Sequence, residues 1–162
     1  VGRLVANKAK ALGMEVWAFD PFVPTEKMEA EGVTVPATLE DLYANCDYIS
    51  LHIPANEKTK GSINYELLSK MPKGGCLVNT ARKEVIDEAG MEKLLADRAD
   101  LKYVTDIAPA NQEALEQFKP RFFATPKKQG AETAEANMNA GLAAARQIVG
   151  FIQNGDVKFK VN

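Results

Sequence analysis

The chain has 162 residues, enough for one domain with a hydrophobic core, and 46% of them are hydrophobic. Its 20 basic residues nearly balance its 22 acidic ones and are scattered along the chain, which argues against nucleic acid as a partner. No hydrophobic run approaches the roughly 20 residues that span a bilayer, and the early basic residues argue against a secretory signal peptide. Two cysteines are too few for a disulfide framework, so the composition predicts a cytoplasmic protein with no membrane partner.

Hydrophobic runs of strand length alternate with amphipathic stretches of helical length. Helices are predicted over 3–12, from Thr38 onward, over 64–71 and 87–96, and along a long stripe formed by Met138, Leu142, Ala145, Val149 and Ile152. Gly13 and Gly155 are expected to end the first and last helices. Strands are predicted over 14–20, 47–53, 76–80, 103–107 and 121–124, with a short one at 157–161. This alternation predicts an α/β fold, a Rossmann-like, doubly wound parallel sheet with ligands at the carboxyl ends of its strands.

The predicted strand ends carry several candidates for chemistry, each with an ordinary structural alternative. Gly2 opens a helix and Asp20 ends a strand 18 residues later, a spacing found in dinucleotide folds but also wherever a helix starts at glycine and a strand exits through Asp-Pro. The planar guanidinium of Arg82 suits a carboxylate, although a surface arginine paired with Glu84 or Asp87 has the same pattern. The single histidine, His52, lies between two aliphatic residues and is more often structural than a general acid. The adjacent lysines 127 and 128 are more often a solvated pair.

Together these segments resemble the D-isomer-specific 2-hydroxyacid dehydrogenase family over essentially the whole chain. Residues 1–6 look like the end of its glycine-rich fingerprint, 19–21 like its ribose-binding acid, and 47–54 like its strand that ends in L-H-x-P. Asn79 to Arg82, followed by Val85 to Glu88, matches the motif N-x-A-R-G-x-x-V-D-E with Lys83 in place of the glycine. Thr125-Pro126 and Gly130-Ala131 resemble the family's T-P-H-x-G-A.

The resemblance implies NAD as cofactor and assigns roles to residues at matching positions. Asp106 is expected near the nicotinamide, and Arg82 is expected to hold the carboxylate of the substrate as a catalytic residue. An acid at position 20 with no basic neighbour favours NAD over NADP. The residues expected to contact the cofactor are Gly2, Arg3, Asp20, Pro21, His52, Ile53, Pro54, Thr59, Thr80, Ala81, Arg82, Asp106 and Gly130.

Three departures from the family pattern matter. The first two glycines of the fingerprint, the strand before them and the substrate domain are not in the sequence, so we expect a fragment whose sheet lacks its first strand. Residues 1–135 are then a truncated nucleotide-binding domain, and 136–162 a helix and tail that return toward the substrate domain. The catalytic histidine is replaced by Lys127, counting from Thr125-Pro126, or by Lys128, counting back from Gly130; Lys127 is preferred. Asn111 stands where the family has the glutamate that orients the histidine. A lysine, whose unperturbed pKa is about 10.4, needs no such acid.

The whole pattern resembles the short D-3-phosphoglycerate dehydrogenases of that family. The expected reaction interconverts 3-phosphoglycerate and 3-phosphohydroxypyruvate, in serine biosynthesis, in a cytoplasmic homodimer, and the fragment alone is expected to be inactive. Two alternatives stay open. One is a glyoxylate or hydroxypyruvate reductase, and the other is an NAD(H)-binding sensor or corepressor on the same fold that catalyses nothing.

Overall fold

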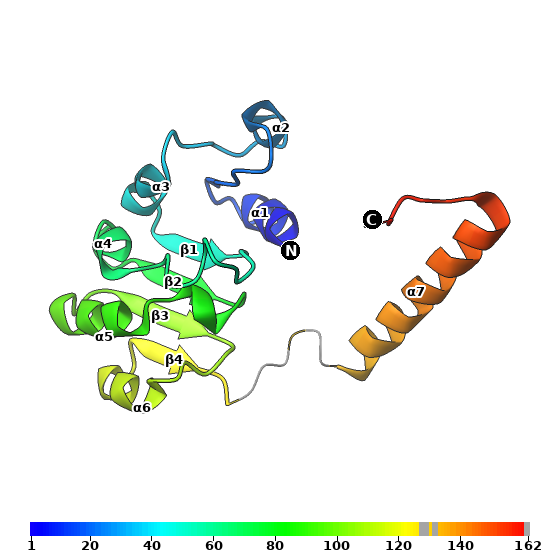
Figure 1. The fold of residues 1–162 in the computed structure, drawn as a ribbon. Coiled ribbons are helices and arrows are strands. Elements are labelled where there is room, and N and C mark those ends of the chain that lie inside the picture. The colour runs from blue at the N-terminus through cyan, green and yellow to red at the C-terminus, as the bar shows by residue number, and fades with distance from the viewer. Residues whose placement is uncertain (127–129, 131–132, 161–162) are drawn as a thin grey trace. The chain divides into compact units, whose positions relative to one another are not determined.

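The chain folds into two compact units, Val1–Pro126 and Lys127–Asn162, in a computed structural model that describes residues 1–126, 130 and 133–160. The first unit is an α/β layer structure, and the described part of the second is one long helix followed by a short tail (Figure 1). The helices are α1 (Gly2–Ala11), α2 (Thr25–Glu29), α3 (Leu39–Asn45), α4 (Tyr65–Leu68), α5 (Glu88–Asp97), α6 (Gln112–Leu115) and α7 (Ala134–Asn154), with 3₁₀ turns η1 (Lys83–Val85) and η2 (Glu116–Phe118). The strands are β1 (Tyr48–Leu51), β2 (Cys76–Asn79), β3 (Lys102–Thr105) and β4 (Phe122–Ala124).

The four strands form one parallel sheet in the order β1-β2-β3-β4, which confirms the Rossmann-like α/β prediction. Parallel neighbours need a crossover, and α4, α5 and α6 each lie between two consecutive strands of this order. Right-handed crossovers that all step in the same direction place their helices on the same face of the sheet. Because all four strands are parallel, their carboxyl ends lie at one edge of the sheet, where the connecting loops leave it.

The hydrophobic core lies between one face of the sheet and these crossover helices. Ile49, Leu77, Tyr103 and Phe122 pair across the four strands in one row and are all buried. Side chains of α4 and α5, such as Leu68, pack against this face. The strands alternate buried and more exposed residues, so Tyr48 and Phe123 on the opposite face are 68% and 54% exposed in this unit.

Local sequence signals fix several helix ends as expected. Thr38 and Asp41 form a reciprocal capping box at the start of α3, with both side-chain-to-backbone hydrogen bonds at 3.1 Å. Asn64 caps α4 by accepting a hydrogen bond from the backbone N–H of Leu67. Gly155 has a φ of +65°, the left-handed conformation that lets a glycine end α7.

Two predicted strands do not form. Residues 14–20 make only an isolated parallel bridge, Trp17 to Thr34, flanked by two backbone hydrogen bonds. A strand is defined by a ladder of hydrogen bonds to a neighbour, and this segment has that pairing at one position only. Residues 157–160 are not a strand either, because α7 and the tail offer no strand partner in the described part of their unit.

Arg98 ties together the loops at the amino ends of the strands. Its guanidinium donates to the backbone carbonyls of Ser69, Met71 and Pro72 at 3.0 to 3.4 Å and pairs with Asp100 at 2.8 Å. Asp100 in turn accepts the backbone N–H of Gly74. Hydrogen bonds from this one side chain therefore fix the turn that leads into β2.

Arg121 performs the same task one strand further along. Its guanidinium donates to the carbonyls of Leu95, Arg98 and Leu101 at 2.9 to 3.2 Å. These carbonyls belong to the end of α5 and to the loop that enters β3. Two arginine side chains thus donate to backbone acceptors at this end of the sheet. Among the described helices, none is long and apolar enough to cross a membrane.

Candidate active site

The carboxyl edge of the sheet brings most of the predicted residues into neighbouring loops. β1 leads into 52–54, β2 into 80–82 and β3 into 106–107, and the register sets Leu51, Asn79 and Thr105 side by side as the last residues of their strands. Loops that leave neighbouring parallel strands at the same edge lie next to each other, and this edge is where open α/β sheets bind ligands.

The amino end of α1 lies against the loop that follows β1. A Cβ atom built on Gly2 would lie 3.2 Å from Cδ2 of His52, so any larger residue at position 2 would push against the imidazole. No acidic residue lies in the first turn of α1, which leaves the positive end of the helix dipole suited to a phosphate. Arg3 is directed elsewhere, because its Nε pairs with Glu31 at 2.8 Å.

His52 has the character of a neutral, structural histidine. Its Nε2 lies 3.0 Å from Oγ of Ser50, and burial lowers its pKa below the usual value. A histidine that resists protonation is poorly suited to donate a proton near neutral pH. The structural interpretation of His52, rather than the general-acid one, is therefore the one that its surroundings favour.

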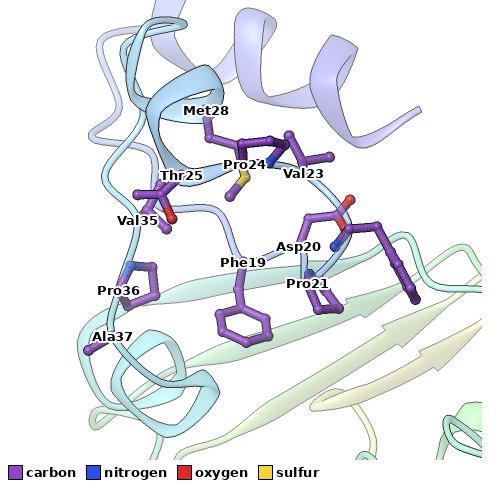
Figure 2. A pocket seen from close by; sticks show the side chains of 11 residues that line it. Phe19, Asp20, Pro21, Val23, Pro24, Thr25, Met28, Val35, Pro36 and Ala37 are labelled. Carbon is purple, nitrogen blue, oxygen red and sulfur yellow. The ribbon is translucent and has the colours of Figure 1, made fainter.

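Asp20 lies on the wall of a cavity of about 430 Å³, formed between the segment after Trp17 and α2 (Figure 2). One of its carboxylate oxygens, Oδ1, accepts the backbone N–H of Phe22 at 2.9 Å, a turn that fixes the side chain and leaves Oδ2 for another donor. Phe19, Pro21 and other largely apolar side chains line the rest of the cavity. An acceptor at the rim of an apolar cavity suits a nucleoside, whose base is flat and whose ribose carries hydroxyl donors. The full lining is Phe19, Asp20, Pro21, Phe22, Val23, Pro24, Thr25, Met28, Val35, Pro36 and Ala37.

The loop after His52 is closed by Thr59. Its hydroxyl donates to the carbonyl of Pro54 at 2.6 Å and accepts the N–H of Asn56 at 2.9 Å. Thr59 therefore shapes the segment that starts at Ile53 and Pro54 and does not present a free hydroxyl.

The loop after β2 presents Arg82 to solvent. Its guanidinium donates to the carbonyl of Ala81 at 2.8 Å, and it forms no ion pair with Glu84 or Asp87 in the described structure. Thr80 is exposed, whereas Ala81 is buried. The simple alternative of a surface arginine paired with a neighbouring acid is thus wrong, and the guanidinium remains able to bind an external carboxylate.

Asp106 carries a buried acceptor that no described group satisfies. Its backbone N–H donates to the carbonyl of Asn79 at 3.3 Å, but its Oδ1 is shielded from solvent and has no hydrogen-bond partner. Unsatisfied buried acceptors are uncommon because they lose their hydration without compensation. A donor from a bound molecule, such as a carboxamide N–H, would complete this group.

Asn111 is also near this end of the sheet, but it is anchored to α5. Its amide nitrogen donates to the carbonyl of Glu88 at 3.0 Å and lies 3.4 Å from Oε2 of Glu92, and its Oδ1 is buried without a partner. Lys127 and Lys128 lie outside the described residues. Gly130 is exposed and belongs to the second unit.

Sequence reasoning overlooked the side chains that hold these loops. Asn79 and Thr105, both buried, bond to the loops at the strand ends. The available signal was a polar residue at the last position of an apolar strand, where burial demands a partner. The cavity residues between Val35 and Ala37 had no such signal, because only the fold brings them near Asp20.

Comparison with known proteins agrees with this geometry. Residues 1–127 match the family model described as D-isomer specific 2-hydroxyacid dehydrogenase, NAD binding domain. The chain is 31% identical to D-3-phosphoglycerate dehydrogenase of Bacillus subtilis over its whole length and covers 31% of that relative. It is 35% identical to hydroxypyruvate reductase of Thermotoga maritima, with 91% of the chain and 48% of the relative covered.

Among solved structures, the NAD⁺-bound 3-phosphoglycerate dehydrogenase of Entamoeba histolytica superimposes with a TM-score of 0.85 at 49% identity. The alignment covers all of this chain and 51% of that one, so the chain spans about half the length of this solved relative. Asp20 beside the apolar cavity and the unsatisfied acceptor of Asp106 both fit NAD. The chain therefore belongs to the D-isomer-specific 2-hydroxyacid dehydrogenase family and contains its NAD-binding domain.

Proposed function

We propose that the chain supplies the nicotinamide-binding half of an NAD-dependent dehydrogenase that interconverts 3-phosphoglycerate and 3-phosphohydroxypyruvate. The observation that carries the proposal is Arg82, which is exposed at the carboxyl edge of the sheet, forms no ion pair with an acid among the described residues, and lies one strand away from Asp106. The high identity to a solved 3-phosphoglycerate dehydrogenase supports this substrate. The phosphate of the substrate would be held largely by a separate substrate domain.

Each residue at this edge has a proposed task. Bound NADH supplies the hydride that reduces the keto carbon. Asp20 accepts hydrogen bonds from the adenosine ribose, and Asp106 orients the nicotinamide through its unsatisfied Oδ1. Arg82 grips the substrate carboxylate with two hydrogen bonds and stabilises the negative charge that develops on the adjacent oxygen.

Lys127 is the proposed proton donor, because it follows Thr125-Pro126 where the family has histidine. As an ammonium, it donates a proton to the developing alkoxide oxygen; in the oxidative direction the neutral amine takes that proton back. Oxidation therefore needs deprotonated lysine, so its rate is expected to climb well above neutral pH. A profile that levels off near pH 7 would contradict the assignment.

The decisive variant is Lys127→Ala in the polypeptide that contains this chain together with a substrate domain. Turnover is expected to fall by about 10² to 10⁴ if this lysine is the general acid. Lys128→Ala is the matched control, because it removes the same charge one residue away. Wild-type turnover in both variants, or a loss only at Lys128, would reject Lys127 as the donor.

The substrate is tested by following NADH oxidation with 3-phosphohydroxypyruvate, hydroxypyruvate and glyoxylate at equal concentrations. We expect the phosphorylated keto acid to give the highest kcat/KM. A preference for an unphosphorylated acid would favour the alternative of a hydroxypyruvate or glyoxylate reductase, which the similarity to the Thermotoga maritima enzyme supports.

A second candidate function is an NAD(H) sensor or corepressor without turnover. Asn111 supports it, because an amide at the position of the family's glutamate cannot raise the proton affinity of a neighbouring base as a carboxylate does. NADH binding with no turnover of any of the three keto acids would select this function. We further propose that the enzyme is a homodimer and that it acts in the cytoplasm. Light scattering of the purified protein would check the homodimer.

A further inference from the structure

The strongest unassigned feature of the fold is a pair of buried polar side chains at the carboxyl edge of the sheet. Asn79 and Thr105 are 0% and 2% exposed, and the other buried residues that the structure describes are hydrophobic or glycine and proline. They are register partners at the last positions of β2 and β3. Buried polar groups need complete hydrogen bonding, so what these two residues bond to shows what they hold in place.

The carboxamide of Asn79 closes the loop that carries Arg82. Its Oδ1 accepts the backbone N–H of Ala81, and its Nδ2 donates to the carbonyl of Arg82, both at 3.0 Å. Only this orientation of the amide satisfies both backbone groups, so the side chain recognises one loop conformation. The same loop is braced on its other side by the guanidinium of Arg82, which donates to the carbonyl of Ala81.

The backbone of Asn79 links this loop to the next strand. Its carbonyl accepts hydrogen bonds from the hydroxyl of Thr105 at 2.9 Å and from the N–H of Asp106 at 3.3 Å. The same hydroxyl accepts the N–H of Ile107 at 3.2 Å, which begins the turn after β3. One residue is therefore bonded to the loop of Arg82 on one side and to the loop of Asp106 on the other.

We propose that Asn79 is a positioning residue that, with Thr105, fixes the separation between the Arg82 loop and the Asp106 turn. The inference rests on the proposed function, in which Arg82 holds the substrate carboxylate and Asp106 faces the nicotinamide. Hydride transfer requires the keto carbon and the nicotinamide ring to meet in a narrow range of distances. The Asn79–Thr105 pair sets that geometry before either ligand arrives.

The test uses Asn79→Asp in the polypeptide that contains this chain and its substrate domain. The substitution keeps the shape and the acceptor for Ala81 but replaces the donor to Arg82 with an oxygen that repels its carbonyl. We expect kcat/KM for 3-phosphohydroxypyruvate to fall about 10- to 100-fold. The dissociation constant of NADH should change less than kcat/KM does, because the proposed adenosine site beside Asp20 is built from other loops. Lowering the pH should restore part of the loss relative to wild type, because the introduced carboxyl group regains a donor when it is protonated.

Asn45→Asp is the matched control. The amide of Asn45 also donates to a backbone carbonyl, that of Asp41, but it is exposed on α3 and far in sequence from both loops. Its kinetic constants are expected to equal those of the wild type.

Thr105 supplies a second test that does not depend on a buried charge. Thr105→Val keeps the shape and removes the hydroxyl, whereas Thr105→Ser keeps the hydroxyl and removes a methyl group. We expect kcat/KM to fall in the valine variant and to be largely retained in the serine variant. If the two variants lose activity equally, packing rather than hydrogen bonding is responsible, and the proposed role of Thr105 is wrong.

The outcomes separate this inference from the proposed function. Wild-type enzyme that binds no NADH and turns over no 2-keto acid would overturn both. If the wild-type enzyme is active and Asn79→Asp lowers the melting temperature but leaves kcat and KM unchanged, only the positioning role of Asn79 is overturned. A selective loss in kcat/KM for the keto acid, with NADH affinity retained, supports it.

Discussion

The two edges of the sheet differ in how their polar groups are satisfied. At the amino edge, Arg98 and Arg121 donate hydrogen bonds to backbone carbonyls of the turns that enter the strands. At the carboxyl edge, within the part of the chain that the structure describes, Arg82 is exposed without an acidic partner, and Oδ1 of Asp106 is buried without a donor. We call the amino ends of the strands the closed end, because internal hydrogen bonds there stabilise the fold. We call the carboxyl ends the open end, because Arg82 and Asp106 there can still bind a ligand. Substitutions at the two ends should therefore affect different measurements.

Among substitutions that compare the two edges of the sheet, the largest effect is expected at the open end, from Arg82→Ala. Loss of the guanidinium removes the two hydrogen bonds proposed to hold the substrate carboxylate and should lower kcat/KM about 10²- to 10³-fold. The melting temperature should stay within a degree or two of wild type, because the side chain is exposed. Steady-state kinetics of the variant measure the loss in kcat/KM, and thermal unfolding of the same sample measures its melting temperature. Arg82→Lys, which keeps the charge but loses the planar fork, should recover only part of the activity.

At the closed end, Arg121→Met should affect stability and leave the site intact. Three backbone carbonyls lose the guanidinium as a donor, so the free energy of unfolding is expected to fall by about 2 to 3 kcal/mol. Urea denaturation measures the loss, and kcat per folded molecule should be unchanged. Arg146→Met on the exposed surface of α7 is the control. If Arg121→Met instead lowers kcat at temperatures where the protein is folded, the division between the two edges does not hold.

A smaller effect is expected at the cavity beside α2, from Asp20→Asn. The amide oxygen can still accept the N–H of Phe22, so the turn is preserved while the negative charge is lost. The dissociation constant of NADH should rise about tenfold, and discrimination against NADPH should weaken. Trp17, the single tryptophan, lies three residues before Asp20, so energy transfer from it to bound NADH reports the affinity. If the dissociation constant of NADH is unchanged in Asp20→Asn, the ribose does not bind at Asp20.

The smallest effect concerns acid stability and Asp100. Hydrogen bonds from Arg98 and from the N–H of Gly74 hold the pKa of Asp100 well below its usual range. As the pH falls below about 4, the unfolded chain takes up a proton at this position before the folded one does, so the free energy of unfolding decreases. In Asp100→Asn this part of the decrease, about 1 kcal/mol or less after solvent screening, should be missing. Urea titrations at pH 6 and pH 3 compare the variant with wild type. Glu113→Gln, which removes an exposed carboxylate, serves as control.

The sequence predicted those parts of the fold that local patterns determine. β1 and β2 are apolar runs that end near Pro54 and Thr80, and the capping residues Thr38 and Asn64 mark helix starts by hydrogen bonds within four residues. The segment over residues 14–20 has an equally good strand pattern, yet it forms one bridge, because pairing depends on a distant neighbour. Local patterns cannot supply that information.

The candidate site divides in the same way. The positions of Arg82 and Asp106 near the carboxyl ends of β2 and β3 were predictable from the strand pattern, although the predicted strand 103–107 included Asp106 and β3 ends at Thr105. The roles of the two residues stay predictions. The support beneath them was not predictable, because Asn79 acts through contacts with its own loop and with the register partner Thr105 on another strand. The hydrogen bonds from Arg98 and Arg121 to backbone carbonyls were not predicted either, because these carbonyls lie 20 to 29 residues away in the chain.

The hydrogen bonds of Arg98 to the turn before β2 have a consequence for how the sequence of such a domain can evolve. They join the turn before β2 to the end of α5 without using any residue of the ligand-binding loops. Substitutions in those loops should then have little effect on the stability of the sheet, so different side chains can occupy the loops without unfolding the domain. Lys127, the proposed substitute for the family's catalytic histidine, would be a change of this kind.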